Sequence, residues 1–385
     1  MTAIALTERQ RRRSLAAIIS AGFGAGMSMA SLLPLISLLL ERHGFEAGLI
    51  GLNAAMFPIS VLLFGSLAPL VARRFGALRT LLISACGFTL LTPLYYLTDP
   101  WCWYGWRFIA GFLGAIGWMT SESWINMVAR PEARGRVMAV YATVIASGMM
   151  VGPFIISAIG IEGFWPFLFI MGAISLTALP LLFARGLSPD FSRQRPLQPL
   201  MAFKHAPTVL MGAVAGGAVD MAVMSLLPVW GVAEGFSQAD AARLISVFAA
   251  GSLLMQWPIG WLADHWSRRG ALLLCSAVTG AGALLLPLLA GTPLLLWPAM
   301  FVWGGVVFGV YTAALALLGD RFPAHELAGA NALFIMAYQV GSLGGPPVAG
   351  VSMDRFGAMG LPVMIAIVSA AYLLFGLARR AMMRG

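Results

Sequence analysis

Long apolar stretches alternate with short polar ones along the whole chain. Twelve of them approach the roughly 20 residues that an α-helix needs to cross a bilayer. They are continuous, unlike the alternating pattern of a membrane β-strand. The pattern predicts an all-α integral membrane protein with 12 transmembrane helices. The predicted spans are residues 15–40, 48–71, 80–98, 103–128, 137–160, 164–184, 208–232, 241–263, 271–290, 294–318, 327–350 and 358–378.

The second half of the chain repeats landmarks of the first half. The sequence Ser-Leu-Leu-Pro at 31–34 returns 194 residues later at 225–228. A Gly-x-x-x-Gly-Pro motif returns after 193 residues, as Gly148, Gly152 and Pro153 and then Gly341, Gly345 and Pro346. We therefore expect two pseudo-symmetric six-helix bundles, residues 1–184 and 208–385, joined by a cytoplasmic linker at 185–207. The Gly-Pro motifs are candidate helix hinges, with close helix packing as the alternative.

Composition excludes a soluble fold. Hydrophobic residues make up 60% of the chain and charged residues 10%, whereas soluble domains carry roughly 25% charged residues. Of the 24 Lys and Arg residues, 20 fall on one side of the predicted membrane. Because cytoplasmic loops are enriched in basic residues, this predicts that both termini lie in the cytoplasm. The net charge of +9 then reflects topology, and we expect no nucleic-acid partner.

One loop carries a family resemblance. The segment 260–269, GWLADHWSRR, resembles the signature G-x-L-x-D-x-x-G-R-R of the major facilitator superfamily, with Ser267 at the second glycine. The gate or loop residues that match are Gly260, Asp264, Arg268 and Arg269. The resemblance extends from the first span to the twelfth. It implies a transporter, working as a monomer, in which Asp264 caps the fifth span and Arg268 or Arg269 meets nearby acids.

Three further segments resemble family patterns. Arg107 opens R-x-x-x-G-x-x-G-A, which implies an intramembrane arginine linked to proton transfer in some members. The alternative is an arginine that extends to the lipid headgroups. The motif at 148–153 is similar to part of a signature of exporters that exchange substrate for protons. Residues 121–126 resemble a poorly characterised bacterial branch of the family, and this resemblance implies a multi-pass protein of the bacterial cytoplasmic (inner) membrane.

Ionisable groups inside a bilayer are expensive and usually functional. The candidates for proton coupling or substrate binding are Asp220, Glu122 and Arg107. Asp220 lies about 18 Å into its span at the rise of an α-helix, near the middle of the bilayer. Counting back 194 residues leads to Gly26, so the repeat itself requires no acid there. Asp220 could exchange a proton, bind a cationic substrate, or be satisfied by neighbouring helices. Glu122, nearer the inner end, could close an inner vestibule or make a structural hydrogen bond.

Other polar or amphipathic residues within the spans are candidates to line a cavity. They are Asn53, Trp118, Tyr141, Gln256, Tyr311, Asn331, Tyr338 and Gln339. A cavity with aromatic residues and one or two acids suits an amphipathic or cationic organic molecule.

We therefore expect a secondary active transporter whose partners are a small-molecule substrate, protons and the lipid bilayer. Proton-coupled export is the first reading. Proton-coupled uptake of a metabolite and a non-transporting receptor or assembly factor on the same fold are the alternatives. An enzyme is disfavoured because no metal-ligand cluster or phosphate-binding loop is present, and we expect no cofactor and no metal.

Overall fold

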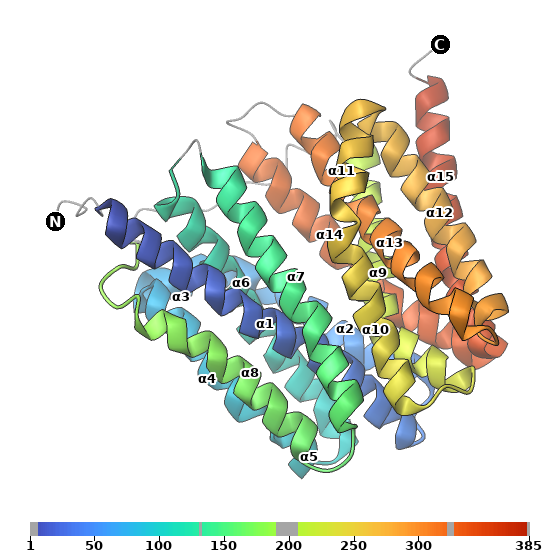
Figure 1. Cartoon of the computed structure of the whole chain (residues 1–385), viewed down its shortest axis with the longest axis horizontal. Coiled ribbons are helices and arrows are strands. Elements are labelled where there is room, and N and C mark those ends of the chain that lie inside the picture. Colours follow the sequence, from blue (N-terminus) through green and yellow to red (C-terminus); the bar gives the residue numbers. More distant parts are fainter. Residues whose placement is uncertain (1–6, 131–132, 190–206, 322–326, 383–385) are drawn as a thin grey trace. The chain divides into compact units, whose positions relative to one another are not determined.

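The computed structural model describes residues 7–130, 133–189, 207–321 and 327–382, and its regular elements in those ranges are all helices (Figure 1). Ten of the described segments are long and apolar enough to cross a membrane, and the last, Ala330–Arg379, includes most of two helices. The helix Trp103–Val128, with 26 residues, is also of spanning length. The result is twelve helical segments, which agrees with the predicted all-α membrane fold.

The chain divides into two compact units. Unit 1 contains Met1–Leu35 and Ile59–Pro196, and unit 2 contains Ile36–Pro58 and Leu197–Gly385. The chain passes from one unit to the other inside helices α1 and α2, next to Pro34 and Pro58 respectively. Because a proline inside a helix removes one backbone hydrogen bond, both crossings lie at a weakened point. Of the predicted linker 185–207, residues 190–206 lie outside the described residues.

Unit 1 is built around a buried cluster to which Ile18, Trp124, Tyr141 and Leu181 contribute. The indole N–H of Trp124 donates to Ser14 Oγ over 2.8 Å, and the Ser14 hydroxyl donates to the Leu187 carbonyl over 3.0 Å. These bonds tie three distant segments of the unit together. The helices that supply unit 1, wholly or in part, are α1 (Glu8–Arg42), α2 (Ala47–Phe64), α3 (Ala68–Phe75), α4 (Ala77–Leu91), α5 (Leu94–Leu97), α6 (Trp103–Val128), α7 (Arg134–Ile159) and α8 (Trp165–Leu182).

Unit 2 has its own buried cluster, to which Leu210, Leu272, Phe334 and Tyr372 contribute. Apart from residues 36–58 of α1 and α2, its helices follow one another in the second half of the chain. They are α9 (Pro207–Ala233), α10 (Gln238–Leu254), α11 (Gln256–His265), α12 (Arg268–Leu289), α13 (Pro293–Arg321), α14 (Leu327–Phe356) and α15 (Gly360–Met382).

The second predicted span of each half is made of two helices. In the span predicted at 48–71, a 3-10 turn at Gly65–Leu67 separates α2 from α3. In the span predicted at 241–263, α10 ends at Leu254 and α11 begins two residues later. A proline lies near the start of the second helix each time, Pro69 in α3 and Pro258 in α11. The interruptions therefore occupy corresponding places in the two repeats.

Glycines bring two helix pairs into backbone contact. In unit 1, a Cβ added to Gly26 of α1 would collide with the carbonyl oxygen of Ile145 in α7. In unit 2, a Cβ added to Gly217 of α9 would collide with the carbonyl oxygen of Tyr338 in α14. Small residues permit this approach between membrane helices. The pairs α1–α7 and α9–α14 are thus packed in the same way.

This packing corrects one expectation from the sequence. Gly26 and Gly217 occupy equivalent places but lie 191 residues apart, not 194. The residue that corresponds to Asp220 is therefore Met29 rather than Gly26. Likewise Tyr338 corresponds to Ile145, 193 residues earlier.

Candidate functional site

The buried carboxylate of Asp220 lies in unit 2, where α9 meets α14. The Tyr338 hydroxyl donates a hydrogen bond to its Oδ2, while Oδ1 is buried and accepts none from the described residues. Burial of a polar atom without a partner costs free energy. The acid therefore keeps one acceptor position that a proton or a donor group could satisfy.

Aromatic rings surround the Tyr338 side of this pair. The ring of Tyr311 in α13 meets the Tyr338 ring edge to face at 5.4 Å and the Phe334 ring at 5.2 Å. Phe308, one turn earlier in α13, stacks at a tilt on Tyr311 at 5.3 Å. Both tyrosines were cavity candidates, and the structure joins them to Asp220 through one chain of contacts. Acid and aromatic faces together are chemistry suited to a cation.

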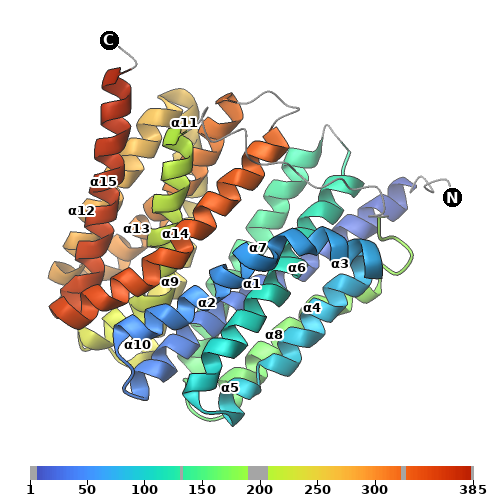
Figure 2. The same ribbon diagram turned by 180° about the vertical axis from the view of Figure 1, so that it is seen from behind.

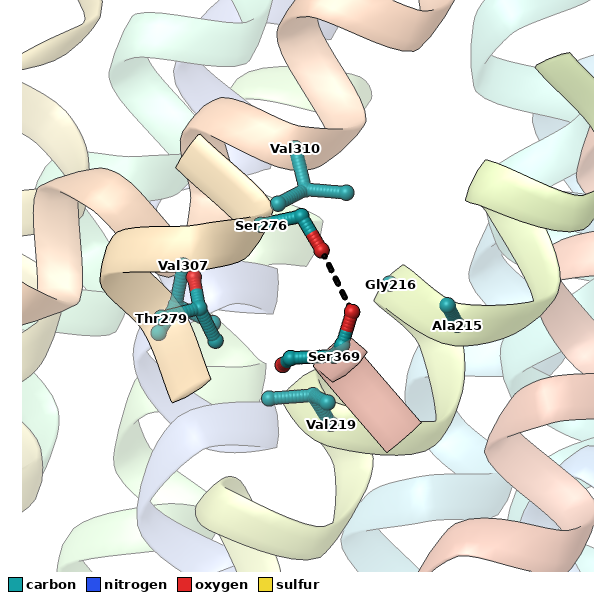
Figure 3. Close-up of a pocket in the computed structure, with 8 residues that line it drawn as sticks. All are labelled: Ala215, Gly216, Val219, Ser276, Thr279, Val307, Val310 and Ser369. Carbon is teal, nitrogen blue, oxygen red and sulfur yellow. Dashed lines mark hydrogen bonds between the residues drawn. The ribbon is translucent and has the colours of Figure 1, made fainter. Parts of the chain in front are cut away.

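A small cavity lies beside this region, among α9, α12, α13 and α15 (Figure 3). Its volume is about 10 Å³, close to the space of a single water molecule. It is partly polar, because Ser276, Thr279 and Ser369 line it. Val219, the residue before Asp220, forms part of its wall. This cavity is too small for an organic solute, so it is not a substrate site.

The remaining polar candidates of unit 2 do not all join Asp220. Gln256 in α11 accepts a hydrogen bond from Thr312 Oγ1 in α13 and donates one to the Ser252 carbonyl over 2.6 Å. Asn331 and Gln339 are half-buried in α14. Asn331 lies two turns before Tyr338 on the same face of the helix. Asn53 of α2 is 2% exposed and its amide nitrogen has no hydrogen-bond acceptor among the described residues.

Glu122 belongs to a separate polar group in unit 1. Its Oε1 accepts a hydrogen bond from the Trp118 indole over 2.6 Å. The Tyr141 hydroxyl has Ser121 and Glu122 as polar neighbours, so three predicted site residues lie together. Trp118 is 46% exposed and Tyr141 is 5% exposed. This polar group therefore extends from the interior of unit 1 to its surface.

Arg107 is enclosed inside unit 1. It is 3% exposed, so it does not extend to the surface as the headgroup interpretation required. The Tyr95 side chain of α5 is a polar neighbour, and the Arg107 Nε has no acceptor among the described residues. Sequence reasoning did not find Tyr95, because nothing in the spacing of the two residues marks the contact.

The loop signature is a local network in unit 2. Arg268 donates to Asp264 Oδ1 over 3.3 Å and to the Ala316 carbonyl of α13 over 3.1 Å. Arg269 donates to the Gly376 carbonyl of α15 over 2.9 Å. Ser267 caps α12, because its Oγ accepts the Gly270 N–H. The role of Asp264 at the fifth span stays a prediction.

The Gly-Pro motifs follow the glycine packing described above. Cβ atoms at Gly148 and Gly152 would collide with the α1 backbone, and Cβ atoms at Gly341 and Gly345 with the α9 backbone. Pro153 and Pro346 each follow directly, inside α7 and α14. Close packing therefore explains these glycines in both repeats, and their role as hinges stays a prediction.

A repeated bundle of apolar helices of spanning length defines a polytopic membrane protein. The family model of the Major Facilitator Superfamily matches residues 18–346. The chain belongs to this superfamily and is therefore a secondary transporter rather than an enzyme, as the loop signature predicted.

Similar proteins agree with this assignment. An uncharacterised MFS-type transporter of Enterobacter sp. strain 638 is 28% identical, over 90% of this chain and 91% of that protein. The uncharacterised MFS-type transporter YfkF of Bacillus subtilis is 27% identical, over 86% of each.

Solved structures share the fold. The nucleoside transporter NupG superposes with a TM-score of 0.73 at 16% identity, covering 98% of this chain and 99% of that chain. A D-xylose-proton symporter superposes with a TM-score of 0.68 at 15% identity, covering 95% and 97%.

Proposed function

We propose that this transporter exchanges protons for an amphipathic or cationic organic solute, with Asp220 as the shared binding group. The observation that carries the proposal is the Asp220–Tyr338 pair, in which one carboxylate oxygen is bonded and the other is buried without a partner. A buried acid of this kind can be neutralised by a proton or by a cation. When each excludes the other, their exchange is antiport.

The comparison of the repeats supports a specific task for this pair. Asp220 and Tyr338 correspond by packing to Met29 and Ile145. The scaffold therefore forms with apolar residues at these two places. An added acid in the second repeat serves something other than the fold, and an ion pathway is the usual use of intramembrane acids.

The solute class follows from the surroundings of the acid. Tyr311, Tyr338 and Phe334 present aromatic rings in contact with one another. Aromatic faces attract organic cations. A solute with a positive charge and an apolar body matches both parts of the site.

Export is the proposed direction, and it rests on the likeness of residues 148–153 to an exporter signature. The protein is proposed to lie in a bacterial inner membrane as a monomer, with both termini in the cytoplasm. The distribution of Lys and Arg supports this orientation, since basic residues favour the cytoplasmic side.

The test is a proteoliposome assay with a pH-sensitive dye inside the vesicles. Organic cations, drugs and metabolites are screened for solute-driven proton movement. Asp220→Asn is expected to abolish proton movement, while Asp240→Asn, which removes an exposed carboxylate of the same unit, keeps it. Equal proton movement in Asp220→Asn and wild type would overturn the proposal.

A further inference from the structure

Residues 36–58 form a helical hairpin that belongs to unit 2 although it lies early in the chain. It consists of the end of α1, the turn after it and the start of α2. The start of α2 contacts α14, and Figure 2 shows these two helices side by side there. By sequence the hairpin is part of the first six predicted spans, whereas α14 is the eleventh predicted span. The contact therefore joins the two sequence repeats.

Asp354 near the end of α14 makes the polar part of this contact. Its Oδ1 accepts the Ala47 N–H over 2.7 Å, and its Oδ2 accepts the Gly48 N–H over 2.8 Å. These two amides are the first of α2, where a helix has N–H groups without intrahelical acceptors. A carboxylate at this place also complements the positive end of the helix dipole. One side chain thus caps a helix that is 306 residues away in sequence.

Glycines make the apolar part of the same contact. A Cβ at Gly51 of α2 would collide with the carbonyl oxygen of Pro346, and a Cβ at Gly350 of α14 would collide with the carbonyl oxygen of Ala47. The two backbones therefore touch along this stretch. Such tight packing depends on small residues, and packed interfaces switch between discrete arrangements rather than deform continuously.

We propose that Asp354 is a latch that holds the hairpin 36–58 on α14, and that the outer end of the transporter opens only when this contact separates. The inference rests on the proposed transport function and orientation, in which the end of α14 and the start of α2 face outward. Alternating access requires the repeats to separate at one end and then at the other. Pro34 and Pro58, at the two ends of the hairpin, are the places where α1 and α2 would bend.

The test measures how easily the hairpin separates, by labelling with a membrane-impermeant maleimide in sealed cells. The three native cysteines are first replaced. Ala47→Cys reports beside Asp354, and Ala54→Cys reports two turns deeper in α2, where the native side chain is 1% exposed. Asp354→Asn keeps the side-chain volume and removes the charge. Asn keeps only one oxygen that can accept an amide, so one hydrogen bond to a charged group is lost. A loss of this kind shifts an equilibrium roughly tenfold, so both reporters are expected to label about ten times faster.

Two further variants sharpen the result. Gly51→Ala forces α2 and α14 apart without changing any charge, and it is also expected to speed the labelling of Ala54→Cys. Asp240→Asn removes a carboxylate that accepts hydrogen bonds from its sequence neighbours Ser237 and Arg243, and it is expected to leave both rates unchanged. Asp354→Asn removes a charge, whereas Gly51→Ala adds a methyl group at the helix contact. If one variant fails to fold, labelling of the other still tests the latch.

Unchanged labelling in the folded variants would overturn the latch. Faster labelling of Ala47→Cys without faster labelling of Ala54→Cys would also overturn it. That result would show that residue 47 alone becomes accessible, while α2 stays packed on α14. The assay uses neither solute nor proton gradient. If Asp220→Asn keeps coupled transport while Asp354→Asn speeds labelling of both reporters, the proposed function fails and the latch stands.

Discussion

Gly217 of α9 lies directly against the carbonyl oxygen of Tyr338 in α14. It precedes Asp220, the acid that accepts a hydrogen bond from the Tyr338 hydroxyl, by about one helical turn. The same residues therefore set both the helix spacing and the position of the buried acid. In unit 1 the equivalent contact, Gly26 against Ile145, exists without an acid. The packing is common to both repeats, and the chemistry is confined to the second.

The first prediction concerns this helix contact. Gly217→Ala is expected to destabilise the protein by about 1–3 kcal/mol, the usual effect of overpacking, because the added Cβ meets backbone that cannot move aside. Thermal unfolding of the purified protein in detergent, followed by fluorescence, measures it. Gly216→Ala is the matched control, since its Cβ would lie 3.7 Å from Val310 Cγ1, an ordinary contact. Equal melting temperatures for the two variants would contradict the packing described.

The second prediction concerns the loop signature. Ser267 stands where the family pattern has glycine, and its Oγ caps α12. Ser267→Ala is expected to cost about 1 kcal/mol of stability, whereas Ser267→Gly costs only a few tenths. Thermal unfolding in detergent distinguishes them. A loss as large with glycine as with alanine would show that the hydroxyl serves another purpose.

The helical membrane fold could be predicted because twelve apolar stretches allow few other structures. The register of the repeats could not. Ser-Leu-Leu-Pro suggests a shift of 194 residues, but the glycine contacts give 191 for α1 and α9. The difference of three residues moves a side chain by about 4.5 Å along a helix. Local likeness of sequence does not report where two backbones touch.

Single residues of the candidate site could be predicted from the sequence, but the contacts between them could not. An acid within a span stands out, so Asp220 was found from the sequence. Its hydrogen bond to Tyr338 spans 118 residues, and the contact of Asp354 with α2 spans more than 300. No spacing rule connects such residues. Asp354 also falls between two predicted spans, 327–350 and 358–378, where an acid is common and does not stand out.

The third prediction separates a structural from a functional role for Arg107. This arginine is enclosed, and its Nε has no acceptor among the described residues. Replacing buried charged groups by apolar residues of similar volume is often neutral or stabilising. Arg107→Met is therefore expected to keep or raise the melting temperature while transport falls at least tenfold. Full transport in a stable Arg107→Met would assign the arginine to packing alone.

The fourth prediction tests the bond that defines the site. Tyr338→Phe removes the hydroxyl that donates to Asp220 and keeps the ring that contacts Tyr311. Leaving a buried acceptor without its donor costs about 1–3 kcal/mol. An energy of this size corresponds to a change of roughly tenfold or more in the affinity of Asp220 for its proton or solute. Solute-driven proton flux in proteoliposomes is therefore expected to fall about tenfold, in protein that is still folded when it is reconstituted.

Tyr372→Phe is the matched control for Tyr338→Phe. The Tyr372 hydroxyl is also buried in unit 2, but it donates to the Thr208 carbonyl over 3.1 Å and has no bond to Asp220. Both variants lose one buried hydroxyl, so a general effect on packing lowers transport in both. A specific role for the Asp220–Tyr338 pair predicts that only Tyr338→Phe loses flux. Equal losses of flux in the two variants would show that the Tyr338 hydroxyl stabilises the fold and has no specific role in transport by Asp220.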